Sequence, residues 1–290
     1  MNPEVLNNQF GIEDKLAFQD FQHTIIAELK HKQATAKVSL YGAHVLSYIS
    51  ESGEEILFVS PQAVYKEGKA IRGGIPICWP WFNAHPIDPS LPSHGFARIS
   101  TWEVISSSAN DEETQLELGL SSNEHTLKLW PYQFEARLVI QLGNRLTVKL
   151  KTINKDDKPF DVSAALHSYF NISDINTVTL EGLADTEYVD DVAQSTGLQA
   201  DELLRFGQRT DRRYITAGKA IINDGEKQIT VEKQGSGITV VWNPGEELAM
   251  QMPDLLEGYK NMLCVEAANS LDDTIIIQPG NEHILSTTIG

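Results

Sequence analysis

Two ionisable side chains interrupt runs of apolar residues, where a buried charge is costly. Glu266 lies within the apolar segment 262–269, and His167 lies within the apolar segment 164–170. A carboxylate among apolar neighbours should be paired or have a raised pKa, and such a group can act as a general base. A glutamate that reaches solvent at a strand end and a histidine with a purely structural role would also fit. From the residues alone, both interpretations stay open.

The segment 72–98 is a second region whose residue types indicate a site. It contains five of the twelve prolines and two of the five tryptophans. Because proline lacks the amide hydrogen that a strand ladder requires, the segment predicts a rigid loop and not a central strand. The loop carries Arg72, His94 and Arg98, each of which could also have only a structural role. Together they favour a binding site, because paired guanidinium groups can hold a phosphate through bidentate hydrogen bonds.

A third candidate is Asp211, which precedes Arg212 and Arg213. Its carboxylate could accept hydrogen bonds from the hydroxyl groups of a sugar. Aspartate beside arginine is also common on protein surfaces, so this pattern is a weak indication by itself.

The composition restricts the possible partners. A total of 23 Lys and Arg residues against 40 Asp and Glu residues gives a net charge of −17, which repels nucleic acid and anionic membranes. A negatively charged substrate would therefore need a locally basic pocket. Residues 1–9 lack a basic segment followed by an apolar core, and no apolar run approaches the roughly 20 residues of a membrane span. We expect a cytoplasmic protein that is a monomer or a weak dimer.

The two cysteines, Cys78 and Cys264, are too few for a disulfide framework. Neither has a CxxC partner or the spacing of a metal site. We therefore expect both to be buried as small apolar residues, and we expect no metal site.

The scaffold that must position these residues is predicted to consist of β-strands. Residues 134–142 and 146–150 alternate between apolar and polar side chains. Gly143-Asn144 follows the first run, and this pattern indicates a hairpin with a two-residue turn, because glycine accepts a positive φ. Similar alternation recurs along the chain, before Gly42, around Leu118 and near Val240.

Helical periodicity is confined to two weak stretches, near residues 192–206 and 253–259. There is no alternation of strand and helix, no long linker and no low-complexity segment. The sequence therefore predicts an all-β fold, a large antiparallel β-sandwich in a single domain of residues 1–290 with a core of about 20–288.

Six short motifs occur in an order that one known family shares. They are residues 72–76 (RGGIP), 79–82 (WPWF), 94–98 (HGFAR), 166–170 (LHSYF), 211–214 (DRRY) and 265–266 (VE). By these motifs the chain resembles the aldose 1-epimerase superfamily, and within it the glucose-6-phosphate 1-epimerase branch. The resemblance covers roughly residues 20–288, and its first block of motifs is the most specific.

The resemblance implies a β-sandwich of the galactose-mutarotase type and a reaction without metal or cofactor. It implies that His167 is the general acid and Glu266 the general base. The substrate-binding residues that it implies are Arg72, Arg98 and Asp211, with His94 beside them. We also expect Ser93 to lie at the substrate and Trp81 of the loop to stack on the sugar.

Two of these assignments depend on details of the motifs. Ser93 stands where some members of the family have glutamine. Asp211 is preferred over Asp185, Asp190 and Asp191 because it alone begins an Asp-Arg-x-Tyr pattern.

The activity that the resemblance implies is the interconversion of α and β anomers through the open aldehyde. One group removes a proton from the C1 hydroxyl while another protonates the ring oxygen, so a base and an acid suffice. The expected substrate is a hexose 6-phosphate, and in particular glucose 6-phosphate.

Three alternatives remain beside this function. A free-hexose mutarotase would use the same chemistry without a phosphate site. A non-catalytic carbohydrate-binding β-sandwich would need neither His167 nor Glu266. A glycoside hydrolase or lyase normally needs two carboxylates, and only Glu266 is a strong candidate.

Overall fold

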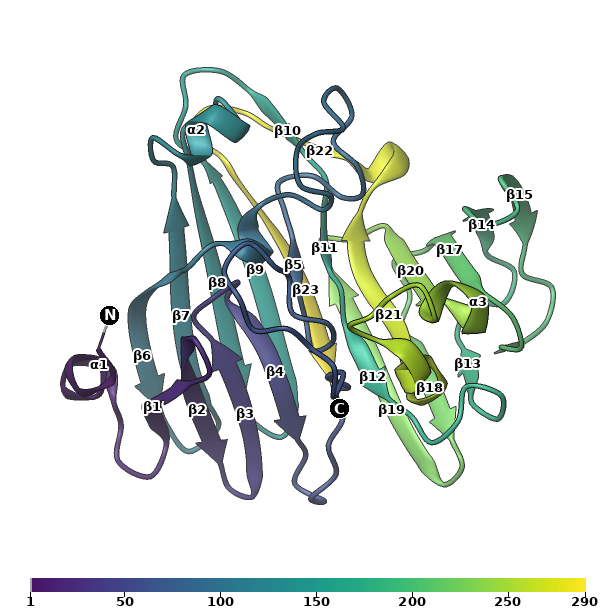
Figure 1. The fold of residues 1–290 in the computed structure, drawn as a ribbon, viewed down its shortest axis with the longest axis horizontal. Helices are drawn as coiled ribbons and strands as arrows, with labels where there is room; N and C mark the ends of the chain where they lie inside the picture. The colour runs from purple at the N-terminus through teal and green to yellow at the C-terminus, as the bar shows by residue number, and fades with distance from the viewer. Residues whose placement is uncertain (1) are drawn as a thin grey trace.

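The computed structural model describes residues 2–290 and consists mainly of antiparallel β-sheets (Figure 1). The largest sheet has nine strands, in the spatial order β16 (Leu203–Arg205), β13 (Thr179–Glu181), β18 (Ala220–Asp224), β19 (Lys227–Gln234), β23 (Glu282–Ile289), β9 (Leu146–Asn154), β8 (Phe134–Leu142), β7 (Thr114–Ser121) and β6 (Glu103–Ala109). The second sheet has eight strands: β15 (Ser195–Leu198), β14 (Glu187–Asp190), β17 (Thr210–Ile215), β20 (Ile238–Asn243), β21 (Met262–Asn269), β11 (Ala164–Leu166) and β5 (Ile77–Cys78) in order, with β12 (Tyr169–Asn171) also pairing with β21.

Two smaller sheets and a few short helices complete the fold. One sheet comprises β1 (Leu16–Phe21), β2 (Thr24–His31), β3 (Ala34–Ser39) and β4 (His44–Ile49), and the other comprises β10 (Phe160–Val162) and β22 (Ile275–Ile277). The α-helices are α1 (Pro3–Phe10), α2 (Thr126–Leu129) and α3 (Gly245–Ala249), and the 3₁₀-helices are η1 (Ala97–Ile99), η2 (Leu256–Asn261) and η3 (Leu271–Asp273). None of the helices within residues 2–290 is long and apolar enough to cross a membrane.

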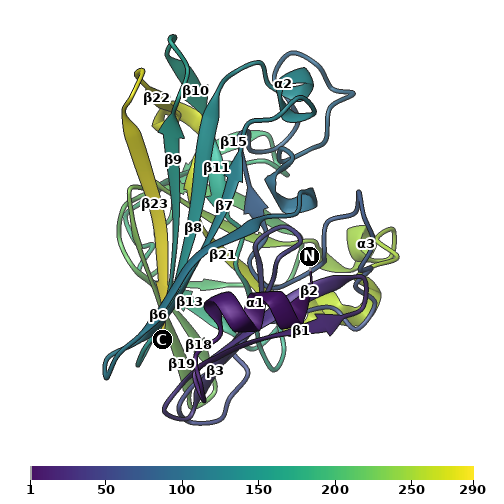
Figure 2. The same ribbon diagram turned by 90° about the vertical axis from the view of Figure 1, so that its left-hand side faces the viewer.

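The sheets form two layers, which Figures 1 and 2 show from two directions. The nine-stranded sheet forms one layer, and the four-stranded and eight-stranded sheets lie side by side in the other. A backbone bridge between Val45 and Ile75 joins β4 to the segment that leads into β5. A continuous apolar core, which extends from Leu6 to Ile289 in sequence, fills the space between the layers. The expected antiparallel β-sandwich is confirmed.

The hairpin of β8 and β9 shows how the alternation in the sequence specifies the fold. Every second residue of both strands is buried, and the strands pair from Phe134 with Asn154 to Leu142 with Leu146. The predicted turn was wrong in detail, because three residues and not two separate the paired leucines, and Gly143 does not adopt a positive φ. A three-residue connection does not require glycine at its first position.

The prediction of a helix was wrong for residues 192–206 and only partly met for residues 253–259. Residues 192–206 contain β15 and β16, which pair with β14 and β13 and so satisfy their backbone groups within sheets. Residues 253–259 overlap only the 3₁₀-helix η2. Local periodicity was weak in both places, and in residues 192–206 pairing with other strands decided the outcome. The cysteines are buried and free, as predicted.

The proline-rich segment 72–98 is mostly irregular, as predicted, and is held rigid by its aromatic residues. Trp79 is fully buried, donates its indole hydrogen to Thr152 Oγ1 at 2.9 Å and packs edge-on against Phe96 and Trp130. These contacts fix the loop on the nine-stranded sheet, so the polar side chains of the loop project from an ordered backbone.

Candidate active site

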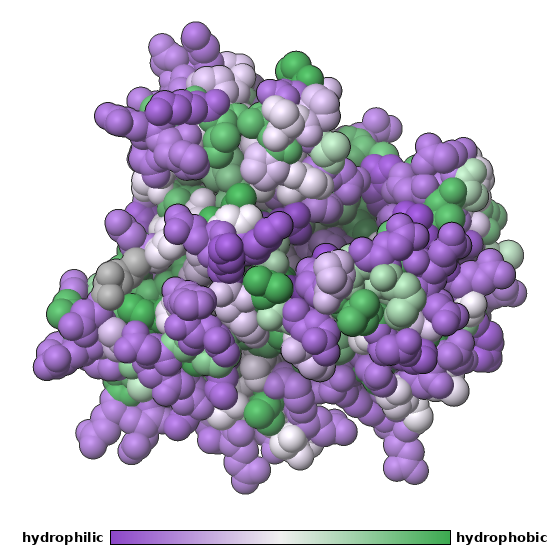
Figure 3. Space-filling view, in the orientation of Figure 1, coloured by the Kyte–Doolittle hydropathy of each residue, from purple (hydrophilic) through white to green (hydrophobic). Residues whose placement is uncertain are grey.

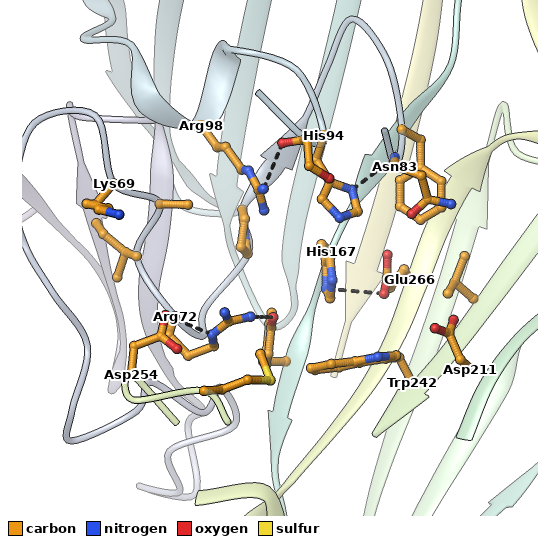
Figure 4. A pocket seen from close by; sticks show the side chains of 18 residues that line it. Lys69, Arg72, Asn83, His94, Arg98, His167, Asp211, Trp242, Asp254 and Glu266 are labelled. Carbon is orange, nitrogen blue, oxygen red and sulfur yellow. Dashed lines mark hydrogen bonds and ion pairs between the residues drawn. The ribbon is translucent and has the colours of Figure 1, made fainter. Parts of the chain in front are cut away.

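A pocket of about 430 Å³ opens on the outer side of the eight-stranded sheet. The space-filling view shows a recess near the middle of this face, bordered largely by hydrophilic residues (Figure 3). The lining comes from segments that are far apart in the sequence: the loop 69–98, the turn between β11 and β12, strands β17, β20 and β21, and residues 252–254. Figure 4 shows the side chains that converge there.

His167 and Glu266 meet at the inner end of this pocket. His167 directly follows β11, and the antiparallel pairing of Leu166 with Ala267 brings it beside Glu266 on β21. His167 Nδ1 lies 3.2 Å from Glu266 Oε1, and the two residues are 8% and 1% exposed. Within residues 2–290, neither His167 Nδ1 nor Glu266 Oε2 has a partner at hydrogen-bonding geometry. These two atoms are themselves buried, so the pair has polar groups without full hydrogen bonds in a position removed from bulk water.

Burial shifts the pKa values of the two residues in opposite directions. It raises the pKa of Glu266 well above 4.5, and the negative charge of Asp211 adds to the effect. It lowers the pKa of His167 well below 6.5, and the positive charges of Arg98 and Arg72 act in the same direction. Removal from water disfavours both charged forms, so burial favours the neutral acid of Glu266 beside the neutral imidazole of His167.

The ring of His167 is fixed by aromatic neighbours. It stacks on Tyr169, with ring centroids 4.7 Å apart and an interplanar angle of 9°, and it meets Trp242 edge-on at 6.0 Å. Both contacts restrict rotation of the imidazole. Its orientation relative to Glu266 is thus set before any ligand enters.

His94 has a defined tautomer. The backbone N–H of Asn83 donates to His94 Nδ1 at 3.2 Å, so this nitrogen carries no proton and Nε2 carries one. Burial, together with Arg98 and Arg72, lowers the pKa of His94 to about 3. His94 is therefore a neutral hydrogen-bond donor at the pocket.

Cationic side chains line one side of the pocket (Figure 4). Arg72 Nε lies 3.2 Å from Asp254 Oδ2, and its Nη1 donates to the Tyr169 hydroxyl at 3.1 Å. Arg98 Nη2 donates to the backbone carbonyl of Ser93 at 2.9 Å. Lys69 lines the same side. This region is the locally basic pocket that an acidic protein needs in order to bind an anion.

Asp211 lies on the opposite side of the pocket, on β17 (Figure 4). Burial, reinforced by the charge of Asp191, raises the pKa of Asp211 to about 6. Asp190 and Asp191 do not line the pocket, because they form ion pairs with Arg212 at 2.9 Å and with Arg213 at 2.6 Å. Asp185 is also absent from the lining, so Asp211 is the one of the four candidate aspartates that faces the pocket.

Replacing Asp211 with asparagine is expected to stabilise the fold at neutral pH. Because the pKa of Asp211 is raised to about 6 in the folded state, the wild-type protein loses stability as the pH rises through that value. The shift corresponds to at most about 3 kcal/mol, and the partial exposure of the side chain reduces it to roughly 1–2 kcal/mol. Denaturant unfolding should show Asp211→Asn as the more stable protein at pH 8, with the difference vanishing near pH 4. A less stable variant at pH 8 would contradict this explanation.

One group of side chains among residues 2–290 has the types and spacing to hold a metal ion. His167, Cys264 and Glu266 each offer one ligand atom, and the three atoms lie within 4.8 Å of one another. Burial raises the pKa of the Cys264 thiol well above 9, so a metal would have to displace its proton. An ion bound there would occupy one ring nitrogen of His167 and one carboxylate oxygen of Glu266, so it would compete with proton transfer by this pair.

The structure brings together most of the residues that the sequence singled out. Those that line the pocket are Arg72, Ser93, His94, Arg98, His167, Asp211 and Glu266. Trp81 is not among them: it is 4% exposed, and its indole hydrogen donates to the Pro92 carbonyl at 2.9 Å. The side chain of Trp81 is used to hold the loop, so the expected stacking on a sugar is not supported by its position.

Sequence reasoning missed several lining residues. Trp242 supplies an aromatic wall, Asp254 pairs with Arg72, and Lys69 adds a third cation. Trp242 lies two positions after Val240 on β20, and both line the pocket, so the period of two along a strand could have indicated its direction. Nothing in the local sequence distinguishes Lys69 or Asp254 from ordinary surface charges.

Comparison with known proteins gives a consistent result. Residues 26–290 match the aldose 1-epimerase family. A protein of Cenchrus ciliaris, named provisionally as a glucose-6-phosphate 1-epimerase, is 38% identical over 269 residues, which cover 87% of this chain and 79% of the relative. A similarly named protein of Escherichia coli K12 is 34% identical over 259 residues, covering 88% and 86%.

Solved structures of related proteins have the same fold. A provisionally named mutarotase from Salmonella typhimurium superposes with a TM-score of 0.89 at 33% identity, covering 97% of this chain and 94% of that one. The galactose 1-epimerase of Lactobacillus acidophilus has a TM-score of 0.76 at 17% identity, with 95% and 98% covered, and this likeness concerns the fold alone.

Proposed function

Because the chain belongs to the aldose 1-epimerase family, we propose that it interconverts the α and β anomers of a hexose 6-phosphate, with glucose 6-phosphate as the main substrate. The protein is an isomerase that acts on sugars. The observation that carries the proposal is the buried contact between His167 and Glu266 at 3.2 Å, at the inner end of a pocket with cations on one side.

The proposed reaction uses one proton of this pair, which passes from Glu266 to His167 when the sugar binds. Glu266 takes the proton of the C1 hydroxyl while His167 protonates the ring oxygen, which breaks the bond between C1 and the ring oxygen. After rotation about the C1–C2 bond, the reverse transfers close the ring from the other face of the aldehyde. The pair ends each cycle with the number of protons with which it began.

The side chains around the pair are proposed to orient the sugar. Asp211, on the side away from Arg72 and Arg98, accepts hydrogen bonds from ring hydroxyl groups. His94 donates from Nε2, the nitrogen left free by its bond from Asn83. Neither group has to change protonation state, so both can hold the ring while His167 and Glu266 exchange protons.

The cationic side of the pocket is proposed to hold the phosphate of the substrate. Arg72 and Arg98 offer guanidinium donors, which suit phosphate oxygens. With the phosphate on that side, the sugar ring extends past His167 and Glu266 toward Asp211, as the arrangement in Figure 4 allows. This orientation places the anomeric centre at the acid/base pair.

We also propose that the protein acts alone and in the cytoplasm. The acid/base pair and the cations of the pocket all come from one chain, which supports a monomer or a weak dimer. The proposed proton transfers require only side chains of this chain. The core that spans both layers supports a single domain over residues 1–290.

Saturation-transfer NMR on equilibrated glucose 6-phosphate, free glucose and free galactose, with and without the protein, tests the function. We expect the protein to accelerate exchange between the anomers of glucose 6-phosphate far more than exchange of the free sugars. Acceleration of the free sugars alone would assign a free-hexose mutarotase. Acceleration of none of them would leave a sugar-binding module and overturn the proposal.

The dependence of activity on Asp211 should itself depend on pH. The ratio of kcat/KM between wild type and Asp211→Asn is expected to fall by several-fold to about tenfold as the pH decreases from 8 to 5. The reason is that Asp211, with a pKa of about 6, loses the charge that strengthens its bonds to hydroxyl groups. Ionisation of the substrate phosphate affects both proteins equally, so its effect on kcat/KM cancels in the ratio. A ratio that stays constant across this range would exclude an ionised Asp211 as a substrate ligand.

A further inference from the structure

Lys69 lies at the start of the segment that forms the cationic side of the pocket. Its side chain lines the cavity together with Arg72 and Arg98, and Figure 4 shows all three on the side away from Glu266 and Asp211. The sequence motifs begin only at Arg72, so this lysine was not among the candidate residues. Its position raises the question of how positive charge is distributed over the three side chains.

The backbone of Lys69 is anchored to the fold. Its carbonyl accepts a hydrogen bond of 3.0 Å from the hydroxyl of Tyr41, and its N–H donates to the Lys66 carbonyl at 3.1 Å. Tyr41 is only 9% exposed and packs with Ile71 in a small apolar cluster. The lysine therefore extends into the pocket from a fixed turn, and only its side chain has to be ordered by a ligand.

The charges on this side of the pocket are unequally balanced. Arg72 has an acidic partner, because its Nε lies 3.2 Å from Asp254. Arg98 donates only to a backbone carbonyl, and neither Arg98 nor Lys69 has a carboxylate within 4.0 Å among residues 2–290. Two positive charges thus remain uncompensated beside the cavity.

A phosphate monoester carries about −1.5 to −2 charges at pH 7. Two uncompensated cations match that charge, whereas Arg72 with its own carboxylate adds donors but little net charge. We propose that Lys69 determines the selectivity for a phosphorylated sugar, acting with Arg98 to neutralise the phosphate while Arg72 orients it. This inference rests on the proposed function and deepens it, because it assigns the preference for the phosphate over the free hexose to a residue outside the recognised motifs.

Lys69→Gln tests the proposal, with Lys66→Gln as the matched control. Lys66 belongs to the same exposed segment but lines the adjacent groove around Tyr65 and not the pocket. The ratio of kcat/KM for glucose 6-phosphate to that for free glucose should fall about tenfold in Lys69→Gln, mainly through KM, as expected for the loss of one partly exposed charged hydrogen bond. Lys66→Gln should keep the wild-type ratio, and Lys69→Arg should restore most of it.

The same variants can be tested without catalysis. Inorganic phosphate, titrated into the protein and followed by ³¹P NMR, should bind about tenfold more weakly to Lys69→Gln than to wild type or Lys66→Gln. Equal phosphate binding by all three proteins would overturn the role of Lys69, as would equal losses for glucose 6-phosphate and free glucose. If wild type accelerated no anomer exchange at all, the proposed function would fail, and the phosphate titration would still decide on Lys69.

Discussion

Replacing Glu266 with glutamine should reduce the catalysed anomer exchange of glucose 6-phosphate by roughly 10²–10⁴-fold. The amide has the shape of the carboxylic acid but cannot take the proton of the C1 hydroxyl. The change should appear in kcat with little effect on KM, because Glu266 lies at the inner end of the pocket and the phosphate is proposed to bind on the cationic side. Saturation-transfer NMR at several substrate concentrations separates the two constants.

This result would be interpretable only if the variant folds. Glu266 is 1% exposed, and burial raises its pKa well above 4.5, so the neutral glutamine should leave the thermal midpoint unchanged or higher. Glu103→Gln, on the exposed side of the edge strand β6, is a matched control that should keep full activity. A folded Glu266→Gln protein with near wild-type kcat would remove Glu266 from the mechanism.

Replacing His167 with glutamine should also lower kcat strongly, by roughly 10²–10³-fold. Glutamine can still donate a hydrogen bond at this position, but it cannot transfer a proton to the ring oxygen. Loss of stacking on Tyr169 should cost about 1 kcal/mol of stability. His125 is exposed, and the control variant His125→Gln should show neither the loss of activity nor the loss of stability.

The double variant of His167 and Glu266 distinguishes an acid/base pair from two independent contributions. If the two side chains exchange one proton as a unit, removing both should cost about as much as removing one. If the losses multiply, the side chains act separately, and the proposed shared proton is wrong. Saturation-transfer NMR on the two single variants and the double variant at one pH provides the comparison.

Much of the scaffold could be predicted from local patterns in the sequence. The alternation of apolar and polar residues in β8 and β9 specifies both strands and their buried faces, because successive side chains of a strand point to opposite sides. The motifs around Arg72, His167 and Glu266 identified residues that do line one pocket. Proline content alone predicted that the loop 72–98 would be irregular.

Tertiary structure alone decided which of these residues meet and which charges remain free. His167 reaches Glu266 because β11 pairs with β21, a contact that no local pattern encodes. Arg72 is neutralised by Asp254, which is 182 positions away in the chain.

Tertiary structure also decided which of several similar side chains lines the pocket. Asp211 lines the pocket, whereas Asp190 and Asp191 are held in ion pairs by Arg212 and Arg213. Trp81 was expected at the substrate but supports its own loop. The physical reason is one of range: side-chain alternation acts over a few residues, whereas burial and the balance of charge depend on strands that only the folded chain brings together.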